Sequence, residues 1–199
     1  LLLFVGSIMA AYYWSQPSLP AQADYYPVGR DINPFTLTDG DGEPFTAANL
    51  AGHWTFLFIG YTYCPDVCPT ALADLRSIYP DLKKIEPSSQ VVFISADPQR
   101  DDSARLKSYT AFFHPEFKAA TGTHRALFPL VRNRGLVYSI VESERKDYLI
   151  DHSASIVLIN PEGKLVAMFR PKVAPGEVAH VDMQTMVSDF ARIVRLAAE

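Results

Sequence analysis

The feature that most constrains the fold is an uninterrupted apolar run, WTFLFIGY, at residues 54–61. The run has the length of a β-strand, and its lack of alternating polar residues is typical of a strand covered on both faces. Shortly after it the chain reads YCPDVCPT, in which Pro69 suits the first position of a helix, because its missing N–H has no partner there. The sequence therefore predicts a buried strand, a loop carrying Cys64 and a helix beginning near Cys68.

The rest of the chain alternates between strand and helix patterns. Strands are predicted at residues 35–38, 91–94, 137–141, 155–159 and 165–169, with a return strand from Phe45, and helices at 71–82, 103–113, 125–134 and 178–196. Pro80 is expected to kink or break the first helix, and Gly135 to cap the third. This order predicts an α/β fold, a thioredoxin-like mixed sheet flanked by helices, with an N-terminal hairpin and a helical insertion.

The N-terminal residues differ from this pattern. Residues 1–14 (LLLFVGSIMAAYYW) carry no charge, but they are fewer than the roughly 20 that cross a bilayer. They are interpreted as a truncated transmembrane anchor that ends in interfacial aromatics, with a signal segment cleaved after Ala21-Gln22-Ala23 as the alternative. Residues 15–34 contain four prolines and are predicted to be a linker to a domain at 35–199. Either interpretation places the folded domain outside the cytoplasm.

The two cysteines carry the main chemical signal. Cys64 and Cys68 are both expected near a helix N-terminus, where the helix dipole favours the thiolate that binds metals and attacks disulfides. A structural disulfide in an exported protein is an equally direct interpretation of this spacing. The net charge of -4 argues against a basic phosphate-binding surface, so nucleic acid is not an expected partner.

A metal site needs a third ligand, and His152 is the candidate among five histidines. It precedes the strand predicted at 155–159, in a loop that faces the cysteine loop in a thioredoxin-like sheet. His53 is expected at the far end of the central strand and His180 on the last helix, while His114 and His124 flank helices. Two thiolates and an imidazole suit one Cu(I) or Cu(II) ion, and zinc in a Cys2His set is the alternative.

Three segments together resemble the Sco (SenC) family of copper chaperones for cytochrome c oxidase assembly. They are GYTYCPDVCPTALADL, VVFISADPQRD and YLIDHSASIVLINPEGKLVAMF. The resemblance covers about residues 31–196, nearly all of the folded part, and the leading hydrophobic segment agrees with it as well. The resemblance implies a thioredoxin-like fold, an N-terminal membrane anchor and copper ligation by Cys64, Cys68 and His152.

The same resemblance implies a function and a location. Members deliver copper to the binuclear copper site of the oxidase, or reduce the cysteines of that site. The implied partners are the copper-accepting oxidase subunit and other copper or thiol-redox proteins of the periplasm or mitochondrial intermembrane space. Tyr63 departs from the family, because many members have histidine there. Asp97, in SADPQRD, is expected near the site without being a ligand.

Four functions are therefore compared. A metallochaperone would use all three residues, whereas a thiol–disulfide oxidoreductase would need only the redox thiols Cys64 and Cys68. A peroxidase of the peroxiredoxin type would need a threonine and an arginine beside one cysteine; Thr62 is present, but no arginine is obviously placed. The fourth is an exported binding domain with a structural disulfide.

Overall fold

A computed structural model of the chain describes residues 18–132, 136–140, 148–172, 176 and 178–198. Within these residues a central mixed sheet has the strand order β1-β10-β9-β4-β5-β6-β2-β3, and β7 and β8 form a separate two-stranded sheet. The strands are β1 (Ala23–Asp31), β2 (Thr36–Asp39), β3 (Pro44–Thr46), β4 (Thr55–Gly60), β5 (Gln90–Ser95), β6 (Lys118–Thr121), β7 (Tyr138–Ile140), β8 (Ile150–His152), β9 (Ile156–Ile159) and β10 (Lys164–Phe169).

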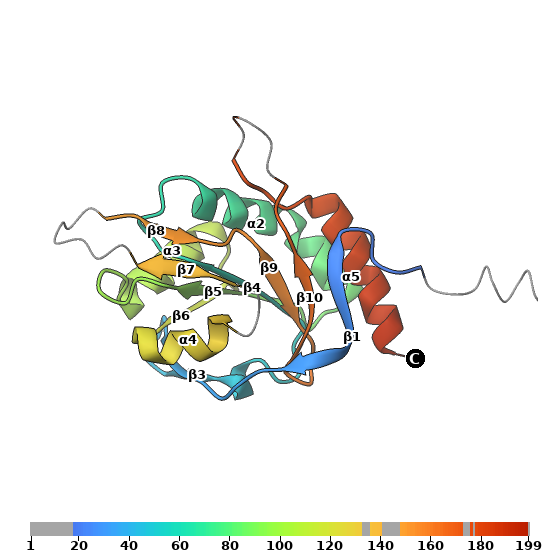
Figure 1. Cartoon of the computed structure of the whole chain (residues 1–199), viewed down its shortest axis with the longest axis horizontal. Coiled ribbons are helices and arrows are strands. Elements are labelled where there is room, and N and C mark those ends of the chain that lie inside the picture. Colours follow the sequence, from blue (N-terminus) through green and yellow to red (C-terminus); the bar gives the residue numbers. More distant parts are fainter. Residues whose placement is uncertain (1–17, 133–135, 141–147, 173–175, 177, 199) are drawn as a thin grey trace, which may run out of the picture.

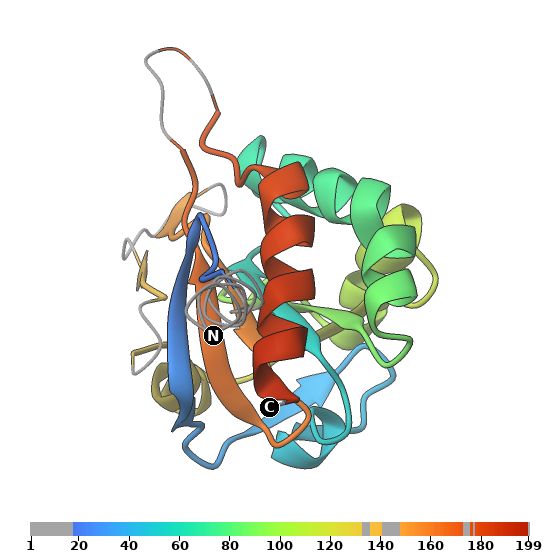
Figure 2. The ribbon, with the colours of Figure 1, turned by 90° about the vertical axis from the view of Figure 1, so that its right-hand side faces the viewer.

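Helices cover both faces of the central sheet (Figures 1 and 2). They are the 3-10 turn η1 (Ala47–Asn49), α2 (Val67–Ile85), α3 (Ser103–Phe113), α4 (His124–Arg132) and α5 (Met183–Ala197). Helices α2, α3 and α5 lie on one face, and α4 lies on the other face with the β7–β8 sheet. This arrangement confirms the predicted α/β class, with helices flanking a mixed sheet.

Strand β4 lies in the middle of the sheet and is buried along its whole length. It pairs in parallel with β5 and antiparallel with β9. Phe56 and Phe58 pack into the core under α2 and α5, whereas Leu57 and Ile59 pack into the core under α4. The continuous apolar run of the sequence is explained by these two cores, because each face of the strand must be apolar.

The predicted linker contains a strand. Residues Ala23–Asp31 form β1 at the edge of the sheet, antiparallel to β10, with a register shift between Tyr25 and Arg30. Pro27 falls within this irregular stretch of an edge strand, where a residue without an N–H is tolerated. The anchor or signal expected at residues 1–14 lies outside the described residues, and no described helix is long and apolar enough to cross a membrane.

Several boundaries differ from the predicted ones. Helix α2 continues through Pro80 to Ile85 instead of breaking, because Pro80 is on the exposed face, where water can satisfy the backbone carbonyl that loses its donor. The cap predicted at Gly135 lies outside the described residues. His180 does not lie on the last helix: its backbone pairs with Lys172, and α5 begins at Met183, capped by the Asp182 side chain.

Candidate metal centre

The cysteine loop leads directly from β4 into α2. The backbone N–H of Cys64 donates to the Tyr61 carbonyl at 3.2 Å, which closes a turn before the helix. The helix N-cap, Asp66, makes no side-chain capping bond. Instead the backbone N–H of Cys68 donates to Sγ of Cys64 at 3.4 Å. Helix α2 begins at Val67, so Cys68 lies inside its first turn and Cys64 lies just outside it. Both sulfurs are therefore at the positive end of the helix.

His152 reaches the cysteines from the other side of β4. It is the last residue of β8, where the sequence suggested a loop, and its backbone is opposite Tyr138 of β7. Its Nδ1 lies 3.2 Å from the Ser153 carbonyl and its Nε2 lies 3.3 Å from Sγ of Cys68. A neutral imidazole has only one N–H, so one of these two nitrogens donates while the other accepts. The rings of Phe58 and Tyr61 meet the imidazole edge-on, each with its centroid 5.9 Å away.

The structure thus brings together the three predicted site residues. One ligand atom from each of Cys64, Cys68 and His152 lies within 4.8 Å of the others, and both cysteines are free thiols. Cys68 is fully buried, while Cys64 and His152 are partly accessible. These donors match the soft thiolate and borderline imidazole preferences of copper and zinc.

The other predicted histidines lie elsewhere. His53 precedes β4 at its opposite end, where its Nδ1 lies 3.0 Å from the Ser88 carbonyl. His114 caps the end of α3 and His124 begins α4. Two acidic residues adjoin the ligands in the sequence: Asp66 is the α2 N-cap, and Asp151 is exposed on β8.

The pKa values of the two thiols are shifted in opposite directions. The hydrogen bond from Cys68, followed by one from His152, lowers the pKa of Cys64 to about 4 despite its partial burial. Burial, followed by the hydrogen bond to Cys64, raises the pKa of Cys68 far above its usual range. In the metal-free reduced protein one proton is therefore held at Cys68 and donated toward a Cys64 thiolate.

Gly60 at the end of β4 makes room for the buried sulfur. A Cβ at this position would overlap Sγ of Cys68 and would lie 2.9 Å from Cε2 of Phe93. The absence of a side chain therefore lets the helix approach the strand closely enough for Cys68 to face His152.

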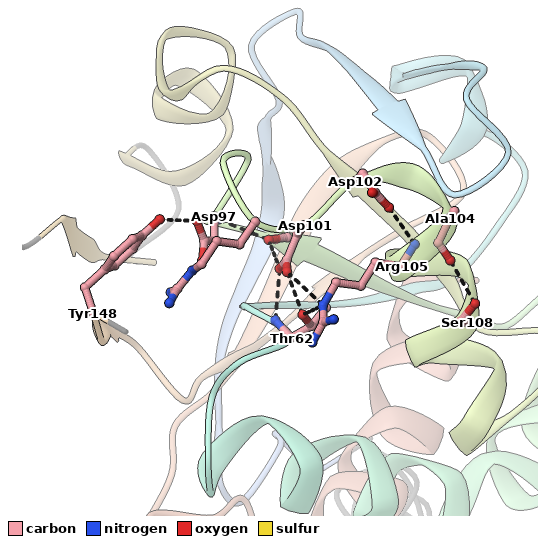
Figure 3. Close-up of polar contacts among 10 residues, drawn as sticks. Thr62, Asp97, Asp101, Asp102, Ala104, Arg105, Ser108 and Tyr148 are labelled. Carbon is pink, nitrogen blue, oxygen red and sulfur yellow. Dashed lines mark hydrogen bonds and ion pairs between the residues drawn. The ribbon is translucent and has the colours of Figure 1, made fainter. Parts of the chain in front are cut away.

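A buried carboxylate fixes the start of the cysteine loop. Asp101 accepts hydrogen bonds from the backbone N–H of Thr62 at 2.9 Å, from its hydroxyl at 2.6 Å and from Ser95 at 2.6 Å. Nε of Arg105 donates to the Thr62 hydroxyl at 2.5 Å (Figure 3). The sequence showed no arginine obviously placed beside a cysteine, and the structure brings Arg105 to Thr62, two residues before Cys64. The available signal was topological, because carboxyl ends of adjacent parallel strands such as β4 and β5 meet at one edge.

A second polar cluster joins the segment after β5 to the segment before β8. Asp97 is 1% exposed; it accepts from the Tyr148 hydroxyl at 2.6 Å and from Nε of Arg100 at 2.5 Å. Burial, followed by the hydrogen bond to Asp97, raises the pKa of Tyr148 to about 12, so its phenol remains a donor. Tyr63 is 47% exposed, and its ring centroid lies 4.8 Å from Cζ of Arg100 and 4.0 Å from Cζ of Arg105.

The fold and this site define a class: a thioredoxin-like α/β protein whose strand-to-helix loop presents two thiols to a histidine from a distant strand. The SCO1/SenC family model matches residues 26–188, and the protein belongs to that family.

Curated relatives agree with this assignment. A mitochondrial SCO1 homologue of Arabidopsis thaliana is 38% identical over 68% of this chain, and a SCO2-like protein of Rickettsia prowazekii is 32% identical over 89% of both chains. The chain spans about half the length of the mitochondrial relatives it matches first, 41% in the Arabidopsis case. The structure of Arabidopsis ScoI with copper bound has 32% sequence identity and a TM-score of 0.72, and the likeness covers 82% of this chain and 97% of that chain.

Proposed function

We propose that this protein binds one copper ion through Cys64, Cys68 and His152 and delivers it to the binuclear copper site of cytochrome c oxidase during assembly of that enzyme. The observation that carries the proposal is the convergence of two sulfurs and one imidazole nitrogen within 4.8 Å. Membership of the SCO1/SenC family and the copper-bound Arabidopsis relative support copper as the ion. Zinc can occupy such a set in vitro, because it accepts the same ligands.

The protonation state of the site fits the capture of a cation. Cys64 offers a thiolate and His152 offers an imidazole nitrogen, while Cys68 carries the proton that must leave when its sulfur binds. Metal binding therefore releases about one proton near neutral pH. Because Cys64 is more accessible than Cys68, an incoming thiolate from an acceptor protein would displace the Cys64 sulfur first.

The asymmetry of the thiols favours a second candidate, a thiol–disulfide oxidoreductase that reduces the cysteines of the copper-accepting site. The Cys64 thiolate would attack the acceptor disulfide, forming a mixed disulfide and releasing one acceptor thiolate. Cys68, after losing its proton, would attack the Cys64 sulfur and release the second thiolate. Two electrons pass to the acceptor, and Cys64 and Cys68 end as a disulfide, a form that cannot bind the metal.

These activities require an oxidase partner and a compartment outside the cytoplasm. We propose a membrane-anchored protein with its folded domain in the periplasm or the mitochondrial intermembrane space. The mitochondrial names of several relatives and the uncharged segment at residues 1–14 support this location. Other copper or thiol-redox proteins of that compartment are proposed as further partners.

The test compares three forms of the reduced protein: wild type, His152→Ala and the control His180→Ala. The control histidine is outside the three-residue cluster, and its Nδ1 lies 3.1 Å from the Val178 carbonyl. Competition with a chromophoric Cu(I) chelator measures affinity. Wild type and His180→Ala should each bind about one equivalent with equal affinity, and His152→Ala should lose about a hundredfold or more. Equal affinity in all three forms would refute the ligand set.

The same variants separate the two functions. With a disulfide-bonded peptide as substrate, an oxidoreductase that works without the metal should retain most of its activity as His152→Ala, because the hydrogen bond from Cys68, the larger cause of the low Cys64 pKa, is kept. Loss of copper transfer with retained peptide reduction in His152→Ala would assign reduction to the thiols and delivery to the three-residue site.

A further inference from the structure

The polar cluster at Asp97 connects the two halves of the candidate site. Asp97 and Arg100 follow β5, Tyr148 precedes β8, and the Asp97 carboxylate accepts one hydrogen bond from each of the other two. Figure 3 shows the Tyr148 hydroxyl pointing at Asp97 across the space between these segments. The acceptor is a carboxylate that is almost fully buried, so each of these hydrogen bonds is stronger than one between neutral groups at the surface. Loss of either bond would leave a buried carboxylate oxygen without that donor.

The Arg100 guanidinium extends this connection to the cysteine loop. It lies 3.6 Å from the ring centroid of Tyr148, 4.8 Å from that of Tyr63 and 5.7 Å from that of Tyr61. Tyr63 immediately precedes Cys64, and Tyr148 is four residues before His152. One cation therefore contacts aromatic rings from both segments that supply the site residues.

The remaining support for His152 is modest. Strand β8 has three residues and pairs only with β7 among the described strands, in a sheet separate from the central one. Its ties to the cysteine side include the backbone of Ile150 bonded to the Tyr61 phenol, the contact of 3.3 Å between Nε2 of His152 and Sγ of Cys68, and the rings that flank the imidazole. A two-stranded ribbon of this size is marginal alone, so its position depends on contacts outside the ribbon.

We propose that Asp97, Arg100 and Tyr148 form a clasp that holds β8 against the cysteine loop and sets the position of the His152 imidazole beside Cys68. The three are positioning residues that act through His152. The consequence for metal affinity rests on the proposed function, whereas the consequence for the position of β8 does not.

The first experiment uses the metal-free reduced protein. Tyr148→Phe removes the bond to Asp97 and keeps the ring that stacks on Arg100. The control Tyr138→Phe also removes one tyrosine hydroxyl, from the residue whose backbone is opposite His152, but that hydroxyl contacts His124 outside the clasp. Hydrogen exchange of residues 148–155 should be about tenfold faster in Tyr148→Phe than in the control. Equal exchange in the two variants would overturn the clasp.

The second experiment is a double-variant cycle on Cu(I) affinity. Tyr148→Phe should weaken binding about tenfold in the wild-type background and should change nothing when His152 is already alanine. Arg100→Lys, which keeps the charge but loses the planar stacking, should follow the same pattern. An equal loss from Tyr148→Phe with and without His152 would overturn a role that acts through that residue.

The two experiments separate the inference from the function it builds on. If wild type shows no His152-dependent copper binding but Tyr148→Phe still releases residues 148–155, the clasp holds and the proposed function fails. If copper binding depends on His152 but Tyr148→Phe matches Tyr138→Phe in both exchange and affinity, the function holds and the clasp is refuted. Circular dichroism melting of each variant checks that the fold is retained.

Discussion

At the scale of single residues, two identical thiols differ because the fold gives them different surroundings. Cys68, in the first turn of α2, is fully buried, so ionisation of its thiol would place a charge where little water can reach. Cys64 lies at the open end of the same helix and accepts hydrogen bonds from Cys68, including one from its backbone N–H. In the reduced protein the negative charge is therefore on Cys64 and the proton is on Cys68.

This order predicts a specific titration. The metal-free reduced protein should show one thiolate per molecule at about pH 6, where an ordinary cysteine is almost fully protonated. Its ultraviolet thiolate absorbance should fall as the pH is lowered through about 4, the pKa of Cys64. Cys64→Ser should remove this absorbance at pH about 6, whereas Thr70→Ser, on the same helix, should leave it unchanged. An absorbance that first rises near the pKa of a free cysteine would contradict the assigned order.

At the scale of elements, the site depends on how closely α2 approaches the end of β4. Gly60→Ala would force Sγ of Cys68 or the Phe93 ring to move. We expect a loss of about 1–3 kcal/mol in the free energy of unfolding, from overpacking. We also expect weaker copper binding, because the displaced sulfur no longer faces His152. Urea unfolding and chelator competition measure the two effects.

A matched glycine separates crowding from the effect on the sulfur. Gly122→Ala would bring its Cβ within 2.8 Å of Cδ2 of Leu37, and its nearest neighbours include neither cysteine. This variant should lose stability without losing copper affinity. If Gly60→Ala retained wild-type affinity, or if Gly122→Ala lost as much, the strand-to-helix approach would not control the site.

The elements with strong apolar patterns were predictable, and those without were not. The apolar run at 54–61 correctly predicted β4, because a strand that is buried on both faces is apolar at nearly every position. Strand β6 (KAAT) and strand β8 (IDH) have no such pattern, since their pairing partners rather than their own side chains select the extended form. Strand β1 was obscured by Pro27 in a proline-rich segment, although an edge strand tolerates proline.

The candidate site was predictable only in part, for a related reason. Cys64, Cys68 and His152 are residue types whose chemistry is visible in the sequence. Their supports, Arg100 and Arg105, are ordinary residues in a polar segment, and only the parallel pairing of β4 with β5 brings them to the cysteine loop. Residue type therefore indicates the ligands, whereas topology is needed to identify what holds them.

At the scale of the whole molecule, the N-terminal edge of the sheet is tied to the last helix by one carboxylate. Asp189 of α5 is fully buried and accepts hydrogen bonds from the backbone N–H groups of Ala21 at 2.7 Å, Gln22 at 2.8 Å and Ala23 at 3.1 Å. Arg192 donates to the same carboxylate at 3.1 Å. The contact joins residues more than 160 positions apart, so it closes the fold where the chain enters β1.

Removing this carboxylate should therefore weaken the whole fold without changing the metal site. Asp189→Ala leaves several backbone donors unpaired, and we expect a loss of about 3 kcal/mol in the free energy of unfolding, measured in urea. Asp24→Ala is the control, because its ion pair with Arg170 also ties β1 but is exposed, and should cost less than about 1 kcal/mol. Copper affinity of the folded protein should be unchanged in both, since Asp189 makes no contact with the cysteine loop among its described hydrogen bonds. Equal losses in the two variants would show that this edge is held by strand pairing alone.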